Sequence, residues 1–205
     1  NALAGVWYPD AGKILIDGFY DDVLDLTEKE RQEYLKLPFD EAKYKNGLEV
    51  KELFGENGYT TLERSSARPT LDCNGIWGGF QGEGAKTVLP SKAAAKISMR
   101  LVPDQYPEKI EKLFAEYVKK ISPDTVKVVV KSLHGGNGAI TPLDSPAMDA
   151  AVEAMKKGFG KAPLFTREGG SIPVVSSFQK KLDAPVILLG FGFPGDNIHS
   201  PDEHF

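Results

Sequence analysis

Cysteine is almost absent from this chain of 205 residues, in which Cys73 is the single example. One cysteine cannot form an internal disulfide, and it cannot build a zinc site that needs several thiolates. A lone thiol also fits a reducing compartment, so we expect a cytoplasmic protein.

Long apolar runs and excess positive charge are also lacking. No uninterrupted apolar stretch reaches the roughly 18 residues that a membrane helix requires. The net charge is −4 and the pI about 5.5, which disfavours a nucleic-acid surface. The first residues, Asn1 to Gly5, lack the charged region of a signal peptide. We therefore expect neither a membrane nor a nucleic-acid partner.

Familiar metal-binding patterns are missing as well, because the chain contains no H-x-D, H-E-x-x-H or C-x-x-C sequence. A catalytic zinc ion usually takes three ligands from protein. His199 follows an apolar run, 185–191, that predicts a buried strand, so it is expected at the carboxyl end of a sheet, where ligands bind. It could be one metal ligand whose partners are absent, or an ordinary packed or surface histidine.

The hydrophobic pattern changes near residues 140–142. We predict helices over 28–36, 107–121, 145–158 and 173–182, and strands over 71–80, 93–102, 126–133, 163–166 and 185–191. The remainder of residues 1–69 is expected to be irregular. The order of elements predicts an α+β domain with an antiparallel sheet, followed by a partial α/β segment with parallel strands.

The segment 167–173, Arg-Glu-Gly-Gly-Ser-Ile-Pro, is an unusual turn. Ser171 is a good helix N-cap, and the amides at such a helix start could hold a carboxylate or phosphate. The simpler interpretation is a capped helix after a tight turn. Arg167 and Glu168 flank the turn, where a pair of solvated surface charges is the ordinary expectation.

Two further polar residues stand near predicted strands. Arg100 lies among apolar neighbours, and a partly buried arginine needs an anionic partner, which could be a carboxylate of the same chain. His134 lies in a glycine-rich turn and could be an oxyanion donor or only a loop residue.

Taken together in this order, five segments resemble one family. It is the family of di-zinc dipeptidases related to carnosinase and cytosolic non-specific dipeptidase, with aminoacylase and succinyl-diaminopimelate desuccinylase as more distant relatives. The segments are Gly84–Pro90, Ser98–Pro103, His134–Gly136, Arg167–Pro173 and His199–Ser200.

The resemblance implies an α/β catalytic domain with two zinc ions, or other divalent metals, and a smaller lid domain that forms a homodimer. By this resemblance, residues 1–140 are a connector and an incomplete lid, and residues 141–205 are a returning segment of the catalytic domain. The chain is then expected to be a C-terminal fragment of a hydrolase that cleaves short peptides.

The resemblance also assigns substrate contacts. Arg100 matches the lid arginine that grips the terminal carboxylate of the substrate, and Ser171 shares that carboxylate. Thr87 matches a lid residue that reaches the substrate from the dimer partner. Glu168 faces the free amine of the substrate.

His199 matches a zinc ligand, and His134 is expected near the site. The remaining ligands, the glutamate general base and the oxyanion histidine would precede Asn1, so the fragment alone is expected to be inert. Two alternatives stay open: a deacylase or desuccinylase for N-acyl substrates, which Glu168 argues against, and a non-catalytic dimerisation module.

Overall fold

The computed structural model describes residues 12–168, 172–193 and 195–204, and Ser171 lies outside them. The chain divides into two compact units, Asn1–Ile140 with Leu164–Ser177, and Thr141–Pro163 with Phe178–Phe205. The predicted domain boundary at residue 140 stays a prediction, since a later segment returns to the first unit. None of the helices in the described ranges has the length and apolar composition to span a bilayer.

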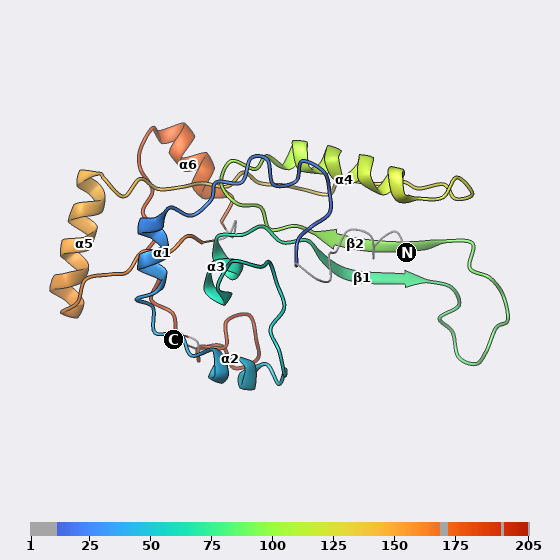
Figure 1. The fold of residues 1–205 in the computed structure, drawn as a ribbon, viewed down its shortest axis with the longest axis horizontal. Coiled ribbons are helices and arrows are strands. Elements are labelled where there is room, and N and C mark those ends of the chain that lie inside the picture. The colour runs from blue at the N-terminus through green and yellow to red at the C-terminus, as the bar shows by residue number, and fades with distance from the viewer. Residues whose placement is uncertain (1–11, 169–171, 194, 205) are drawn as a thin grey trace. The chain divides into compact units, whose positions relative to one another are not determined.

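An antiparallel pair of strands forms the sheet of the first unit (Figure 1). β1 (Asp72–Gly78) pairs with β2 (Ala93–Ser98) from Asp72↔Ser98 to Gly78↔Ala93. The register shifts between Cys73 and Gly75, as a β-bulge does. The predicted α+β architecture with an antiparallel sheet is thus confirmed.

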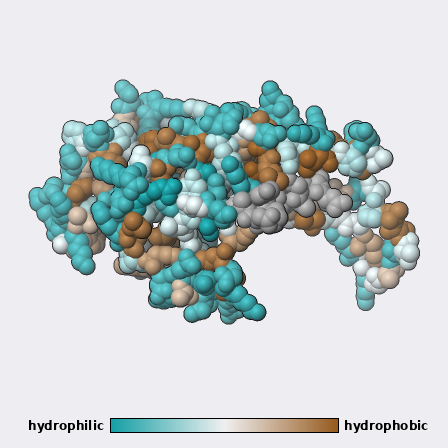
Figure 2. All heavy atoms as spheres, in the orientation of Figure 1, coloured by the Kyte–Doolittle hydropathy of each residue, from teal (hydrophilic) through white to brown (hydrophobic). Residues whose placement is uncertain are grey.

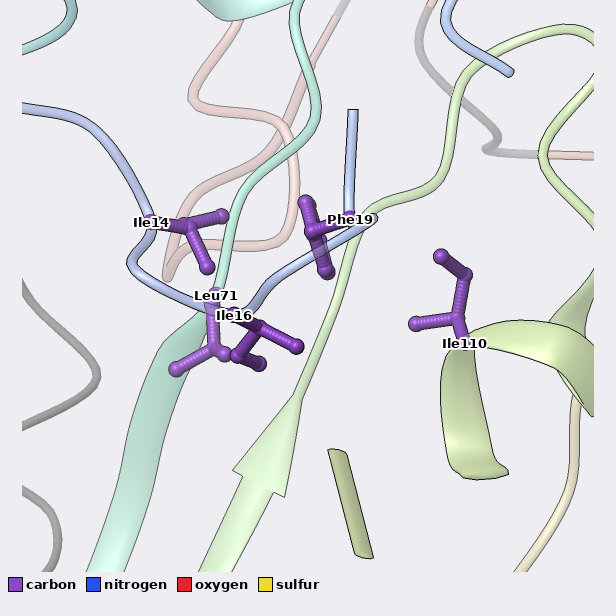
Figure 3. Close-up of a cluster of buried hydrophobic side chains, with 5 residues drawn as sticks. All are labelled: Ile14, Ile16, Phe19, Leu71 and Ile110. Atoms are coloured by element: carbon purple, nitrogen blue, oxygen red, sulfur yellow. The ribbon is translucent and has the colours of Figure 1, made fainter. Parts of the chain in front are cut away.

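Helix α4 (Pro107–Ile121) packs against this sheet and begins with proline at its first turn. Its residue Ile110 joins the buried cluster drawn in Figure 3, which contains Ile14, Ile16, Phe19, Leu71 and Ile110. Leu113, Phe114 and Tyr117 extend the apolar face of the helix, and Ile97, Met99 and Leu101 come from β2 and its exit. These apolar residues recur at helical spacing and form one face of the helix that was predicted over 107–121.

Gln105 is the polar member of this core and is only 1% exposed. Its amide nitrogen donates to the Phe19 carbonyl at 2.7 Å, and its amide oxygen accepts from the Val102 N–H at 3.1 Å. The side chain thus ties the N-terminal connector to the exit of β2.

Three short helices occupy the connector: α1 (Glu28–Tyr34), α2 (Glu41–Gly47) and α3 (Thr61–Ser66). Side chains cap all three, because Thr27, Asp40 and Thr60 each accept a backbone N–H of the first turn. The prediction of irregular structure was wrong for α2 and α3. Helices this short gain little from propensity, so capping and tertiary contacts decide whether they form.

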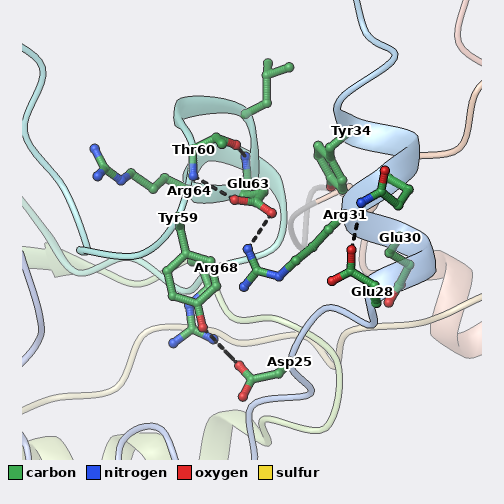
Figure 4. Close-up of polar contacts among 12 residues, drawn as sticks. Asp25, Glu28, Glu30, Arg31, Tyr34, Tyr59, Thr60, Glu63, Arg64 and Arg68 are labelled. Atoms are coloured by element: carbon green, nitrogen blue, oxygen red, sulfur yellow. Dashed lines mark hydrogen bonds and ion pairs between the residues drawn. The ribbon is translucent and has the colours of Figure 1, made fainter.

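Arg68 lies at the centre of a polar cluster between these elements (Figure 4). It is 7% exposed and forms two bonds to the Glu56 carboxylate, at 2.7 and 2.8 Å, and one to Asp25 at 2.8 Å. The Tyr20 and Tyr59 rings lie 5.3 and 4.3 Å from the guanidinium carbon. Burial raises the pKa of the Tyr59 phenol, and the nearby Asp25 carboxylate adds to the rise.

The second unit contains α5 (Pro146–Phe159), which the sequence predicted closely. Ser145 caps its start by accepting the Met148 N–H, and Gly160 ends it in the left-handed conformation with φ of 70°. Helix α6 (Val174–Leu182) also forms where it was predicted.

Three predicted strands are not strands in the described residues: 126–133, 163–166 and 185–191. A strand requires a neighbour for its N–H and C=O groups, and local β-propensity does not supply one. Val129 and Leu188 are 66% and 50% exposed, which shows that these apolar segments are not covered.

Replacing Gln105 with leucine should destabilise the chain. The change keeps the volume but leaves a buried carbonyl and a buried N–H without partners, at a cost of about 1–3 kcal/mol for each group. Urea unfolding followed by circular dichroism measures the change. Gln32→Leu, at an exposed position of α1, is the control, with an expected change within about 0.5 kcal/mol. Equal effects of the two substitutions would contradict the role of Gln105.

The chain should also associate with itself through its small sheet. Only two strands pair among the described residues, and unpaired strand edges recruit other chains. Apolar residues reach the surface on β1 and on the loop after it (Figure 2), with Ile76 70%, Trp77 45% and Leu89 95% exposed.

Sedimentation velocity over a range of concentrations tests this. We expect Ile76→Lys to weaken association, and Val129→Lys, equally exposed but outside the sheet, to leave it unchanged. A monomer at high concentration with its strands intact would show that the idea is wrong.

Candidate functional site

Arg100 lies two residues beyond β2 and its side chain is exposed. Its carbonyl accepts the Thr70 N–H at 3.0 Å, which holds the exit of β2 beside the entry of β1. The expectation of a partly buried arginine was therefore wrong, because the sheet turns Arg100 away from the core that β2 residues such as Ile97 join.

Thr87 lies in the exposed loop that connects β1 and β2. Within that loop, the Lys86 ammonium lies 5.6 Å from the centre of the Phe80 ring, and the Val88 N–H donates to the Lys86 carbonyl. The loop therefore presents Thr87 at the end of the hairpin, where a second molecule can contact it.

Backbone segments that carry predicted site residues meet at two glycines. A Cβ atom on Gly138 would lie 3.2 Å from the Pro103 nitrogen, just after Arg100. A Cβ atom on Gly136 would lie 2.6 Å from Cβ of Pro173, just before α6. The segment that contains His134 thus runs beside both the exit of β2 and the start of α6. Such close approach requires glycine at position 136, because any larger residue would collide with Pro173.

His134 and Glu168 are both exposed. Ser171, which was predicted to cap the following helix, lies outside the described residues. The structure therefore brings the segment of His134 beside the exit of β2, just after Arg100, and beside Pro173. It shows no contact that brings Glu168 to these residues within the described ranges.

Arg167, next to Glu168, is buried, and the expectation of a surface charge was wrong. Its Nε and Nη2 atoms donate to the two oxygens of Glu30 at 2.7 and 2.9 Å. Its Nη2 atom also donates to the Asp25 carbonyl at 3.0 Å, and Nη1 donates to the Leu24 carbonyl. The partners are far away in sequence, so no local pattern could have identified this pair.

Tyr34 holds the backbone of the same residue. Its hydroxyl accepts the Arg167 N–H at 3.0 Å and contacts the Arg167 carbonyl at 3.4 Å. The same hydroxyl lies 2.6 Å from the Ser66 hydroxyl on α3. The side chain of Arg167 thus binds Glu30 of α1, and its backbone binds Tyr34 of the same helix. Both contacts hold segment 164–168 against α1.

The charge on Glu30 is stabilised in this position. Burial raises the pKa of its carboxyl, but hydrogen bonds from Arg167 and from Thr27 outweigh burial and hold the pKa below its ordinary value. The pair therefore contributes stability above the pKa of an unfolded glutamate, and this contribution is lost as the pH falls through the lowered value.

His199, in the second unit, is exposed and has a left-handed backbone with φ of 62°. Its N–H donates to a carboxylate oxygen of Glu203 at 3.1 Å. The predicted strand before it is absent, so it does not follow a sheet. In the part of the chain that the structure describes, no group of three or more His, Cys, Asp or Glu side chains could hold a metal ion.

A separate pocket of about 530 Å³ lies between α1 and α3. Leu35, Leu37, Phe39 and Leu62 supply apolar lining, while Glu28, Arg31 and Glu63 supply charged groups. None of the predicted site residues within the described ranges lines it, so it offers no support for their assignment.

The model of the M20 peptidase dimerisation domain matches residues 23–126. The Cys-Gly metallodipeptidase DUG1 of Candida albicans is 37% identical over 94% of this chain, and the human Beta-Ala-His dipeptidase is 31% identical over 98%. A crystal structure of an M20 family metallo-carboxypeptidase from Sulfolobus solfataricus superimposes with a TM-score of 0.81 at 29% identity, covering 98% of this chain and 46% of that one.

The chain spans 40% of the length of these two curated relatives. The first is named as a metallodipeptidase and the second as a dipeptidase. Three findings agree on the family. They are the match of the domain model, the similarity of the fold and the sequence identity over nearly the whole chain. This chain belongs to the M20 peptidase family, and residues 23–126 match the family's dimerisation domain.

Proposed function

We propose that this chain is part of a metal-dependent dipeptidase that hydrolyses short peptides with a free C-terminal carboxylate. The observation that carries the proposal is the convergence of three segments at Gly136 and Gly138. The segment with His134 lies against the backbone just after Arg100 and against Pro173, which follows Glu168 by five residues in the sequence. These residues offer a cation, an imidazole and a carboxylate. A dipeptide carries a carboxylate, a polar amide and an ammonium group, and these charges complement such a set.

Arg100 is assigned to the terminal carboxylate of the peptide. Its planar guanidinium can donate two parallel hydrogen bonds to a carboxylate, and Ser171 is assigned to the same group. Glu168 is assigned to the free amine, which an N-acyl substrate lacks. His134 is assigned to the vicinity of the site, and its segment's position beside the exit of β2 and Pro173 supports this assignment.

Thr87 is assigned to the substrate of the partner subunit in a homodimer. The match to a dimerisation domain and the exposed position of the β1–β2 loop support this role. A site that takes a residue from each of two chains would be complete only in the dimer. A cytoplasmic location, supported by the lone Cys73, belongs to the same proposal.

His199 is assigned to one zinc ion of the proposed enzyme. A neutral imidazole is a suitable donor, but a catalytic zinc needs about three protein ligands, and the described residues supply no such group. The described residues therefore do not fit a complete metal centre, and we assign the other ligands to protein beyond them. When bound, zinc would supply a Lewis acid and an activated water.

Isolated, this chain should not bind zinc tightly, because one imidazole cannot hold the ion against water. Isothermal titration of zinc into the chain and into its His199→Ala variant tests this, and both should show only weak uptake. Stoichiometric uptake that disappears in the variant would show that the chain completes a site by itself.

In the full-length protein, we expect hydrolysis of dipeptides that a chelator abolishes and zinc restores. Arg100→Ala should raise the barrier by about 2–5 kcal/mol if its ion pair with the substrate is desolvated. The measurement is kcat/KM for a dipeptide and for its C-terminally amidated form.

Lys96→Ala removes an exposed cation from β2, four residues before Arg100, and is the matched control, with little change expected. An equal loss on both substrates for Arg100→Ala would remove its assigned role. Absence of any metal-dependent hydrolysis by the unaltered protein would refute the proposed function.

A further inference from the structure

All residues that line the pocket between α1 and α3 belong to the first unit. Its volume of about 530 Å³ is within the range of roughly 300–1,000 Å³ that is usual for small-molecule sites. Leu37 and Leu62, which line it, pack against the buried Tyr34. Leu35 and Phe39 also line it and are 69% and 36% exposed. An apolar group bound there would remove this surface from water.

Arg31 places a cation in the wall of this pocket, and two neighbours hold it. Its Nη1 atom donates to Oε1 of Glu63 at 2.8 Å, and its guanidinium carbon lies 5.0 Å from the centre of the Tyr59 ring (Figure 4). Glu63 is only 3% exposed, and its second oxygen accepts the Thr60 N–H at 2.7 Å. A guanidinium carries several N–H donors, and within the described ranges the side chain of Arg31 uses only the one that meets Glu63. Donors therefore remain for an anionic group in the pocket.

Glu28 supplies a carboxylate to the same pocket. It precedes Arg31 by nearly one turn of α1, and side chains at this spacing are neighbours, with Cβ atoms about 5–6 Å apart. One of its oxygens accepts the Gln32 amide at 2.7 Å. Among the residues that the structure describes, no cation forms an ion pair with Glu28, whose side chain is exposed. The pocket thus presents a carboxylate beside a guanidinium that is only partly engaged.

These two charges restrict the chemistry of a ligand. A simple carboxylic acid would be attracted by Arg31 but repelled by Glu28, and a simple amine would meet the reverse arrangement. A zwitterion satisfies both groups. The apolar lining favours an apolar remainder, because burying a polar group without partners costs free energy. A free amino acid with an apolar side chain combines these features in one small molecule.

We propose that the pocket between α1 and α3 binds a free apolar α-amino acid. Arg31 binds its carboxylate, Glu28 binds its ammonium group, and the apolar lining surrounds its side chain. Because the lining comes from both short helices, a bound amino acid also stabilises their arrangement. This inference does not rest on the proposed function, since it uses no residue assigned to the peptide substrate.

The test labels the full-length protein with a leucine analogue that carries a photoreactive diazirine in its side chain. Mass spectrometry locates the label, which we expect in peptides that contain residues 35–39 and 58–63. Excess leucine should suppress this labelling. N-acetyl-leucine lacks the ammonium group and leucinamide lacks the carboxylate, so each should compete at least about fivefold less well than leucine.

Three variants assign the charges. Glu28→Gln should remove the preference for leucine over N-acetyl-leucine and retain the preference over leucinamide. Arg31→Lys keeps a cation for Glu63 but loses the planar fork, so it should weaken competition by leucine at least about threefold. Glu33→Gln is the matched control, because Glu33 is a carboxylate of the same helix that binds Lys36 and does not line the pocket. It should change neither preference.

Label found only outside the two peptides, or label that leucine does not displace, would overturn the proposal. Equal competition by leucine and N-acetyl-leucine would do the same, as would equal effects of Glu28→Gln and Glu33→Gln. If thermal unfolding shows that Arg31→Lys does not fold, Glu28→Gln at its exposed position decides the outcome.

Discussion

The buried pair of Arg167 and Glu30 connects parts of the chain that are 137 residues apart. A guanidinium removed from water costs several kcal/mol unless its donors are satisfied, and here the carboxylate and two carbonyls satisfy it. The same carboxylate completes the cap of α1. Segment 164–177 therefore belongs with the first unit because of a specific set of polar contacts.

Two buried arginines organise this region in the same manner. Arg68 and Arg167 each bind both oxygens of one glutamate, and each also reaches Asp25, one through its carboxylate and one through its carbonyl. Neither α1 nor α3 is long enough to be stable alone. Ion pairs of these charged side chains, together with a small apolar cluster around Tyr34, therefore stabilise the two short helices.

Local signals explain which elements the sequence revealed. Pro107 and Pro146 start α4 and α5, and apolar residues at helical spacing follow in α4, so both helices formed close to their predicted ranges. Strands over 126–133 and 185–191 were predicted from composition, but pairing is a long-range property that composition cannot supply. The burial of Arg167 was missed for the same reason, since its partner is remote in sequence. Glycine spacing revealed an unusual turn near Pro173 but could not show that Gly136 lies against it.

The candidate site residues are exposed to solvent, and this limits how strongly each could bind a charged ligand. Arg100, Glu168 and His134 all face solvent in this structure, where an ion pair is worth about 0–1 kcal/mol. Selective recognition of a small charged peptide needs larger contributions, which arise only when charged groups are desolvated together. A functional site here therefore requires further protein surface over these residues. Under the proposed function, the exposed hairpin of a second subunit, which contains Thr87, supplies part of that surface, and the match to a dimerisation domain supports this proposal. Recognition of substrate and formation of the dimer would then depend on the same contacts.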